Sequence, residues 1–192
     1  MTSFDTRHRI LDAAWELVRE RGTTAVRVAD VADAAGVSRQ LVYVYFDSRA
    51  GLLLAMARHH DARSGFAARV QTSRQLPPRA ALESLLRAWC SYVPEILPVA
   101  RALEAAAGAG ALGADAWEDR MSDLRTAFRM AVDRLADAGG LGRGWSAAAA
   151  SDWIWALSHV ANWQHLVVEC GWNPTDYTER VVRSVLAEVA PQ

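Results

Sequence analysis

The sequence predicts an all-α protein, and three observations lead to this prediction. Alanine, the strongest helix former, is abundant throughout the chain. Apolar residues recur at the three- and four-residue spacing of a helix. No segment shows the strict alternation of apolar and polar residues that is typical of a strand. The 192 residues are 52% hydrophobic and 22% charged, which is the composition of a globular protein.

The chain begins with two predicted helices. The first covers residues 6–21, where apolar residues repeat with helical period until Gly22 ends the pattern. Arg7 and Arg9 at its start are either phosphate contacts or solvated charges at a helix end. The second covers residues 28–35. Its apolar face is formed by Val28, Val31, Ala32 and Ala35.

A glycine turn separates the second helix from a third. Gly36 suits the left-handed conformation that ends a helix, and Ser38 can cap a helix over about residues 39–45. Val42 and Phe46 fall on one side of this helix. The other side carries Arg39, Gln40, Tyr43 and Val44. An ordinary helical hairpin would carry mainly Glu, Lys and Ala there, so this face favours a helix-turn-helix whose second helix enters the major groove of DNA.

These residues resemble a known family. The run Ala32-x-x-Ala35-Gly36-Val37-Ser38, followed by Tyr43-x-Tyr45-Phe46-x-Ser48-Arg49-x-x-Leu52, is similar to the signature of tetracycline-repressor-type (TetR family) regulators. The similarity covers about residues 7–55, and beyond them only the helical pattern and the length are similar. Arg27 stands where Thr is common in the family, Gln40-Leu41 where small residues are common, and Arg49 where Lys is common. The resemblance implies a three-helix DNA-binding head and a body of about six helices that binds a ligand and dimerises.

The remaining chain is predicted to form those further helices. Asp47-Ser48 precede a helix over about residues 49–72, which a polar segment with two prolines ends. Pro94 and Pro98 predict a kink or a restart after the next helix. The later helices are expected at residues 79–93, in a short apolar segment to residue 107, and at 115–138, 146–169 and 174–189. The predicted domains are a helix-turn-helix DNA-binding domain at 1–47 and a ligand-binding and dimerisation domain at 48–192.

The last two predicted helices carry apolar residues on more than one face. Such a helix must bury its extra stripe, and a homodimer in which each chain contributes the same two helices would bury it. The family resemblance also implies a dimer. The residues expected at this interface are Ile154, Leu157, Ala161, Val182, Leu186 and Val189. The alternative is that the stripe packs on other helices of the same chain.

Phosphate contacts supply affinity for DNA and base contacts supply specificity. The resemblance implies phosphate contacts by Ser38, Tyr43, Tyr45 and Arg49. Arg27 is a further candidate, because it lies at a helix N-terminus. Arg39 and Gln40 can reach base edges, since Arg pairs with guanine and Gln with adenine. Leu41 and Val44 can contact thymine methyl groups. For Tyr45, packing against the first helix is the alternative.

Six of the eight tryptophans lie between residues 89 and 163. A tryptophan is ordinarily part of a core, yet this group also suggests an aromatic-walled pocket for a hydrophobic or aromatic small molecule. The candidate ligand-binding residues are Trp89, Tyr92, Trp117, Phe128, Trp155, His159 and Asn162, with Glu95 as a further polar candidate.

Other kinds of chemistry have little support. The sequence contains no Ser/His/Asp constellation in a familiar context, no phosphate-binding glycine loop and no HExxH motif, so we expect neither an enzyme nor a cofactor. Cys90 and Cys170 are single and match no metal spacing, which fits a reducing, cytoplasmic setting without a metal site. No signal sequence or apolar run long enough for a membrane is visible. The net charge of −1 means that DNA binding would depend on a few well-placed arginines.

The sequence therefore leads to the hypothesis of a dimeric, ligand-responsive transcription regulator. Repression is its expected mode of action: it would bind a palindromic operator in double-stranded DNA and be released by a hydrophobic or aromatic small molecule. One alternative is a helical small-molecule-binding protein or enzyme with a vestigial helix-turn-helix, which would not bind DNA. Another is a constitutive DNA-binding protein whose tryptophan-rich body is solid core.

Overall fold

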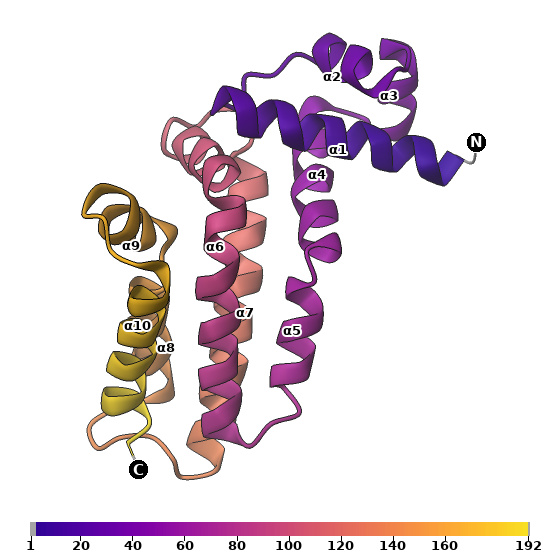
Figure 1. Ribbon diagram of the computed structural model, residues 1–192. Coiled ribbons are helices and arrows are strands. Elements are labelled where there is room, and N and C mark those ends of the chain that lie inside the picture. The colour runs from indigo at the N-terminus through magenta and orange to yellow at the C-terminus, as the bar shows by residue number, and fades with distance from the viewer. Residues whose placement is uncertain (1–2, 192) are drawn as a thin grey trace. The chain divides into compact units, whose positions relative to one another are not determined.

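The computed structural model describes residues 3–191 of the chain (Figure 1). All regular structure within these residues is helical, so the predicted fold class is confirmed. The elements are α1 (Ser3–Arg21), α2 (Val28–Ala35), α3 (Arg39–Tyr45), α4 (Arg49–Arg63), α5 (Phe66–Ser73), α6 (Pro78–Gly108), α7 (Ala114–Asp137), α8 (Ala147–Leu157), α9 (Val160–Trp163), the π-helical η1 (Gln164–Glu169) and α10 (Pro174–Val189). None of the described helices combines the length and apolar character needed to cross a membrane.

The chain separates into two compact units. The first unit contains the chain up to Ser64 together with Pro98–Met121. The second contains Gly65–Leu97 together with the chain from Ser122 onward. The boundary between residues 47 and 48 that the sequence suggests stays a prediction. In this division, the end of α6 and the start of α7 belong to the same unit as α1 to α4.

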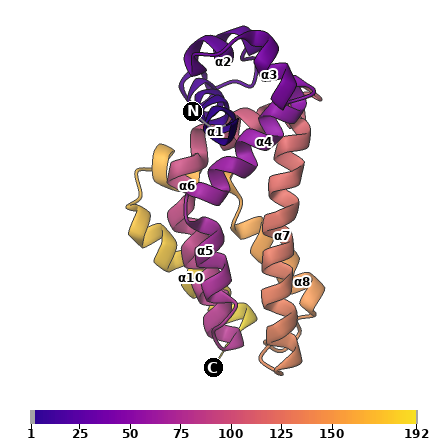
Figure 2. The same cartoon turned by 90° about the vertical axis from the view of Figure 1, so that its right-hand side faces the viewer.

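In the first unit, α1 packs against both α2 and α4. Its buried side chains recur with the helical period that predicted it: Ile10, Leu11, Ala14, Trp15 and Val18. From α4, Leu52, Leu53 and Met56 are buried as well. Figure 1 and Figure 2 both show α2 and α3 lying together beside α1. The predicted first three helices are therefore confirmed, and their apolar faces form one core.

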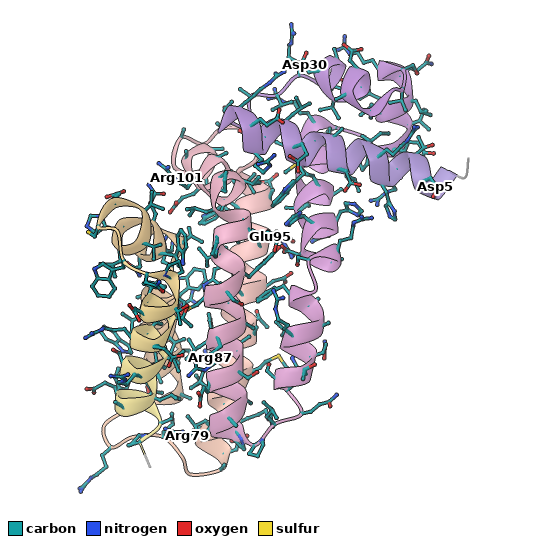
Figure 3. The ribbon with its side chains drawn as sticks, in the orientation of Figure 1. Asp5, Asp30, Arg79, Arg87, Glu95 and Arg101 are labelled. Atoms are coloured by element: carbon teal, nitrogen blue, oxygen red, sulfur yellow. The ribbon has the colours of Figure 1, made fainter. Side chains whose placement is uncertain are left out.

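The second unit has an apolar core and ion pairs at its edge. The core includes Leu82, Leu86, Phe128, Val132, Ile154 and Val185. Arg87 on α6, labelled in Figure 3, forms an ion pair with Glu179 on α10. Because this guanidinium stabilises the ionised carboxylate, the pKa of Glu179 is lowered below its usual value. Arg79, also on α6, donates a hydrogen bond of 2.9 Å to the carbonyl of Ala190 beyond the end of α10.

The predicted helix over residues 49–72 is wrong in its length, because it is two helices. α4 ends at Arg63 and α5 begins at Phe66. Gly65 between them has φ +75°, a left-handed conformation that a helix cannot contain and that glycine adopts without steric cost. The glycine is thus a helix break that the apolar spacing did not reveal.

The predicted restart of the helix at Pro94 and Pro98 is also wrong, whereas the alternative prediction of a kink stays a prediction. α6 is one helix of 31 residues that runs through both prolines. The prolines are four residues apart and both are exposed, so their rings lie on the same, solvent-facing side of the helix.

The predicted helix over residues 146–169 is divided as well. α8 ends at Leu157, and His159 has an extended backbone with φ −63° and ψ 138°. Nδ1 of His159 accepts a hydrogen bond of 3.3 Å from the backbone N–H of Ala161, which starts α9. The four-residue α9 then passes into η1. The final predicted helix is confirmed as α10, with Pro174 in its first turn.

Candidate nucleic-acid interface

The turn between α2 and α3 is built as the sequence predicts. Gly36 has φ 64° and ψ 41°, in the left-handed region. Its N–H donates to the carbonyl of Asp33 at 3.1 Å, and the N–H of Val37 donates to the carbonyl of Ala32 at 2.9 Å. These bonds satisfy carbonyls that the end of α2 leaves unpaired. A residue with a Cβ would be strained at this φ, so the turn depends on glycine.

α3 is capped at its start and anchored on one side. The Ser38 hydroxyl oxygen accepts a hydrogen bond of 3.2 Å from the N–H of Leu41. Val42 is 1% exposed and Phe46 is 6% exposed, so this side faces the core of the first unit. The cap and the anchor together fix which side of the helix faces outward.

The outward side of α3 brings four predicted DNA-contacting residues together. Arg39 and Gln40 are exposed, and Tyr43 and Val44 are 42% and 72% exposed. The Arg39 guanidinium lies 5.7 Å from the centre of the Tyr43 ring, within the range of a cation–π interaction. Leu41 is half-buried between the two sides. A cation, an amide, a phenol and a bare apolar group thus share one surface, called below the α3 outer face (Arg39, Gln40, Tyr43 and Val44).

Arg27 precedes α2 and has an acidic partner. Its side chain is 80% exposed, and it forms an ion pair of 2.8 Å with Asp30. Arg21 pairs with the same carboxylate at 2.6 Å. Hydrogen bonds from Arg27 and Arg21 lower the pKa of Asp30 below its usual value, so the carboxylate stays ionised. The three residues together leave one net positive charge beside the helix-turn-helix.

The other predicted phosphate contacts are partly enclosed. Tyr45 is half-buried, with its ring centre 6.3 Å from that of Phe46. Arg7 is half-buried too, with its guanidinium 5.4 Å from the centre of the Phe46 ring. Arg49 is half-buried and donates a hydrogen bond of 2.5 Å to the backbone carbonyl of Thr24. Thr24 lies 25 residues earlier in the chain, so the sequence pattern contains no signal for this bond.

The helix-turn-helix segment has a family match. Residues 10–56 match the family described as bacterial regulatory proteins, tetR family. The match covers the helix-turn-helix segment and the start of α4, and it does not extend to the rest of the chain.

Curated relatives are similar to this chain over less than half of its length. The HTH-type transcriptional repressor LfrR of Mycolicibacterium smegmatis is 37% identical over 93 residues, which is 48% of this chain and 48% of LfrR. The HTH-type transcriptional regulator TtgR of Pseudomonas putida is 29% identical over 83 residues, 43% of this chain and 40% of TtgR. The matches thus span less than half the length of these relatives. Both relatives are named as regulators of transcription, not as enzymes.

Solved structures of regulators share the fold over nearly the whole chain. The fatty acid degradation regulator FadR of Bacillus halodurans superposes with a TM-score of 0.76 at 17% identity, covering 97% of both chains. FadR of Bacillus subtilis, solved in complex with stearoyl-CoA, has a TM-score of 0.73 at 14% identity and covers 93% of this chain and 97% of its own. At such identities the likeness shows the fold.

Three of the aromatic residues predicted to bind a ligand lie inside the second unit. Trp89, Tyr92 and Phe128 are 3%, 1% and 0% exposed. The indole N–H of Trp89 donates a hydrogen bond of 2.6 Å to the carbonyl of Ser158. The Tyr92 ring stacks on Phe66, with 4.7 Å between ring centres. The sequence pattern contains no signal for a role of Phe66, which lies inside the helix that was predicted to be continuous.

The other predicted ligand residues are dispersed. The rings of Trp155 and His159 meet edge to face, 6.4 Å apart. Asn162 donates a hydrogen bond of 2.7 Å to the carbonyl of Ala156, so it bridges the break after α8. Glu95 on α6 is exposed, and Trp117 lies in the first unit.

A groove in the second unit involves none of the predicted ligand residues. It has a volume of about 740 Å³ and is lined by residues of α5, α6 and α10, including Thr72, Ser91 and Thr178. Cys90 also lines it, and burial raises the pKa of this thiol to about 12, so the thiol stays protonated. Within residues 3–191, no group of three His, Cys, Asp or Glu side chains is arranged to hold a metal ion.

The residues predicted at a dimer interface differ in exposure. Four of them are covered by their own chain: Ile154, Val182, Leu186 and Val189 are at most 7% exposed. Leu157 is half-buried and Ala161 is exposed. The exposed aromatic residue of α8 is Trp153, which is 43% exposed and has its ring centre 6.3 Å from that of Trp145. Packing within the chain therefore buries four of these six side chains.

Proposed function

We propose that this chain is a DNA-binding transcription repressor that acts as a homodimer and leaves its operator when a hydrophobic or aromatic small molecule binds. The observation that carries the proposal is the α3 outer face. On a helix of seven residues, this face keeps a valine 72% exposed next to an arginine, a glutamine and a tyrosine. The fold gains nothing from exposing that valine, whereas the major groove of DNA offers thymine methyl groups to it.

In this proposal the α3 outer face reads the bases. Arg39 and Gln40 stand in the first turn of α3 and contact guanine and adenine edges. Val44 contacts thymine methyl groups one turn later, and Leu41 does so with the part of its side chain that is accessible. Residues at the start of a recognition helix reach deepest into the groove, so Arg39 and Gln40 contribute most to sequence specificity.

Phosphate contacts supply the affinity. The Ser38 hydroxyl accepts a bond from the protein, and its hydrogen can be donated to a phosphate oxygen. Tyr43 and Tyr45 offer phenol hydroxyls at the rim of the groove. Arg27 adds charge, but part of that charge is neutralised by Asp30. Because few cations take part, we expect a shallow dependence of affinity on salt for a DNA-binding protein.

The homodimer joins the last two predicted helices of each chain, which are the segment from α8 to η1 and α10. Leu157 and Ala161 keep accessible surface and remain in the proposed interface, and Trp153 adds a large apolar side chain to it. A two-fold symmetric pair of helix-turn-helices binds two half-sites about 34–36 Å apart. The operator is therefore an inverted repeat with its half-sites one helical turn apart.

The effector binds to the second unit, next to the predicted aromatic residues. B. subtilis FadR has the same fold and was solved with stearoyl-CoA, which supports an apolar ligand for this architecture. A coupling of about 1–3 kcal/mol between effector and DNA corresponds to release by about 5–150-fold. Trp89 and Trp155 give the binding step a fluorescence signal.

Affinity for a duplex selected from a randomised pool tests the DNA-binding part. The dissociation constant is measured by fluorescence anisotropy for the selected duplex and for a scrambled one. Arg39→Ala should weaken binding of the selected duplex by about 1–3 kcal/mol. Arg143→Ala is the control, because Arg143 is an exposed arginine of the second unit. Equal affinity for both duplexes, or equal loss in both variants, would contradict the proposal.

The effector part is tested by titrating tryptophan fluorescence with stearoyl-CoA and with anilinonaphthalene sulfonate. A compound that quenches the fluorescence is then added to the protein–duplex complex. We expect the compound to weaken duplex binding. Unchanged duplex affinity at saturating compound would contradict the coupling.

A further inference from the structure

Thr24 is one of two buried residues in a loop whose other residues are exposed, and the second is Val26, which is 4% exposed. Residues 22–27 connect α1 with α2, and Thr23, Ala25 and Arg27 in this loop are exposed. Thr24 is only 6% exposed. Loop residues ordinarily face water, so other segments must cover Thr24. Two parts of the first unit do so, the start of α4 and the turn between α6 and α7.

Arg49, the first residue of α4, binds the backbone of Thr24. Its Nη2 donates a hydrogen bond of 2.5 Å to the Thr24 carbonyl, and the arginine is half-buried. A hydrogen bond from a charged donor is stronger than one between neutral groups. This bond ties the start of α4 to the loop that leads into α2.

Gly113, in the turn between α6 and α7, approaches the side chain of Thr24. A Cβ on Gly113 would lie 2.9 Å from Cγ2 and 3.3 Å from Cβ of Thr24. It would also lie 3.4 Å from Cδ2 of Leu103 on α6. Gly113 has φ +110°, which L side chains rarely adopt. Both the backbone conformation and the close contact therefore require glycine at this position.

Ion pairs hold the start of α7 against α4. Arg58 on α4 pairs with Asp119 on α7, with one hydrogen bond of 3.1 Å from Nε. Arg120 on α7 pairs with Asp61 on α4 at 2.7 Å. Hydrogen bonding from Arg58 lowers the pKa of Asp119 below its usual value, so this pair stays charged. The turn that carries Gly113 thus leads into a helix that is fixed to α4.

We infer that Thr24 is a positioning residue for DNA binding, because Arg49 and Gly113 hold it and it sets the direction in which α2 and α3 leave α1. The inference rests on the proposed DNA-binding function. It assigns Arg49 a role that acts through Thr24 instead of at a phosphate. Because Gly113 lies in the turn between α6 and α7, this turn also contacts the loop that leads into α2.

The contact between Gly113 and Thr24 is tested with matched glycine variants. Gly110→Ala is the control, because Gly110 lies in the same turn with φ +60° but has no atom within 4 Å of an added Cβ. Gly113→Ala should lower affinity for the selected duplex by about tenfold, since the added Cβ displaces Thr24. Thr24→Ser removes the methyl group and should restore part of that loss in the double variant. Equal affinity of Gly113→Ala and Gly110→Ala, or a double variant no better than Gly113→Ala, would overturn the inference.

The role of Arg49 is tested by the salt dependence of binding. Removing a phosphate contact reduces the slope of log affinity against log salt by about 0.9. Arg49→Ala should instead lower affinity about equally at every salt concentration and leave the slope unchanged. Arg27→Ala, at a proposed phosphate contact, should reduce the slope. A reduced slope for Arg49→Ala would show a phosphate contact and overturn its positioning role.

Hydrogen exchange separates this inference from the proposed function. If the unmodified protein binds the selected and the scrambled duplex equally, the proposed function fails. The positioning of α2 can still be tested by the hydrogen exchange of its backbone amides. Gly113→Ala and Arg49→Ala should both speed exchange of the α2 amides, whereas Gly110→Ala should not. Unchanged exchange in α2 for both variants would overturn the inference independently of DNA binding.

Discussion

The α3 outer face and the aromatic residues of α6 and α7 place similar large side chains in opposite settings. Tyr43 and Val44 are 42% and 72% exposed. Trp89, Tyr92 and Phe128 are at most 3% exposed. The Trp89 N–H is also bonded to a backbone carbonyl. The side chains of the α3 outer face are thus exposed to solvent, whereas the aromatic side chains of α6 and α7 are packed inside the second unit.

The difference shows how a functional residue can be told from a structural one. Burial of Phe128 removes apolar surface from water and stabilises the fold. Exposure of Val44 contributes nothing to stability, although the neighbouring Val42 shows that the same helix can bury a valine. Val44 is therefore a candidate for contact with a partner, whereas the packed aromatic residues are accounted for by their neighbours.

The largest effect is expected in the core of the second unit. Phe128→Ala should lower the free energy of unfolding by about 3–5 kcal/mol, because it leaves a cavity at a fully buried position. The folded protein should keep its duplex affinity, since the α3 outer face is unchanged. Urea denaturation and anisotropy measure the two quantities. A stable variant with weakened duplex binding would contradict the assignment of Phe128 to the core and of DNA binding to the α3 outer face.

Trp89→Phe tests whether Trp89 is part of the packed core or lines a ligand-binding pocket. The change removes the N–H that donates to the Ser158 carbonyl, so the free energy of unfolding should fall by about 1–3 kcal/mol. A tryptophan that lined a ligand cavity would give the opposite pattern: stability nearly unchanged, and weaker quenching by the small molecule. Denaturation and the fluorescence titration distinguish these results.

A smaller effect on both properties is expected at the start of α3. Ser38→Ala removes the cap from the N–H of Leu41 and should cost about 1 kcal/mol of stability. Duplex affinity should fall too, because Ser38 is also a proposed phosphate contact. Ser122→Ala, at an exposed position on α7, is the control and should leave both unchanged. Loss of neither property in Ser38→Ala would contradict the described start of the helix.

The smallest effect is a dependence of stability on pH in the first unit. Burial lowers the pKa of His59 below its ordinary 6.5, although the hydrogen bond to Asp12 opposes this shift. Because the folded pKa is below the unfolded one, His59 contributes its full stability above the unfolded pKa and loses it as the pH falls toward the folded pKa. Stability should therefore decline slightly from about pH 7 to about pH 5. His59→Gln should make this decline shallower, as measured by urea denaturation at the two pH values.

Local signals explain why the helix-turn-helix could be predicted from the sequence. Gly36 and Ser38 act on backbone groups within three residues of themselves, so their effects can be read from neighbours in the chain. The side of α3 that faces outward follows from Val42 and Phe46 in the same way. The predicted directions of these side chains were therefore correct.

Long-range contacts explain what the sequence did not reveal. The bond between Arg49 and Thr24 and the approach of Gly113 to Thr24 join segments far apart in the chain. The apolar stripe that suggested a dimer is largely covered by the chain itself, because Ile154 and Val189 are 0% exposed. Periodicity shows that a face must be buried but does not identify its partner. The helix break at Gly65 was missed because a single glycine within a helical stretch does not by itself mark a break.

The most direct test of the α3 outer face as a reader of bases is to select duplexes from a randomised pool with the unmodified protein and with Gln40→Ala. Our account predicts that the unmodified protein enriches an inverted repeat. It also predicts that Gln40→Ala loses preference at one base position of each half-site, because each half-site meets one copy of α3. Enrichment of no sequence by the unmodified protein, or of the same full repeat by both proteins, would contradict it.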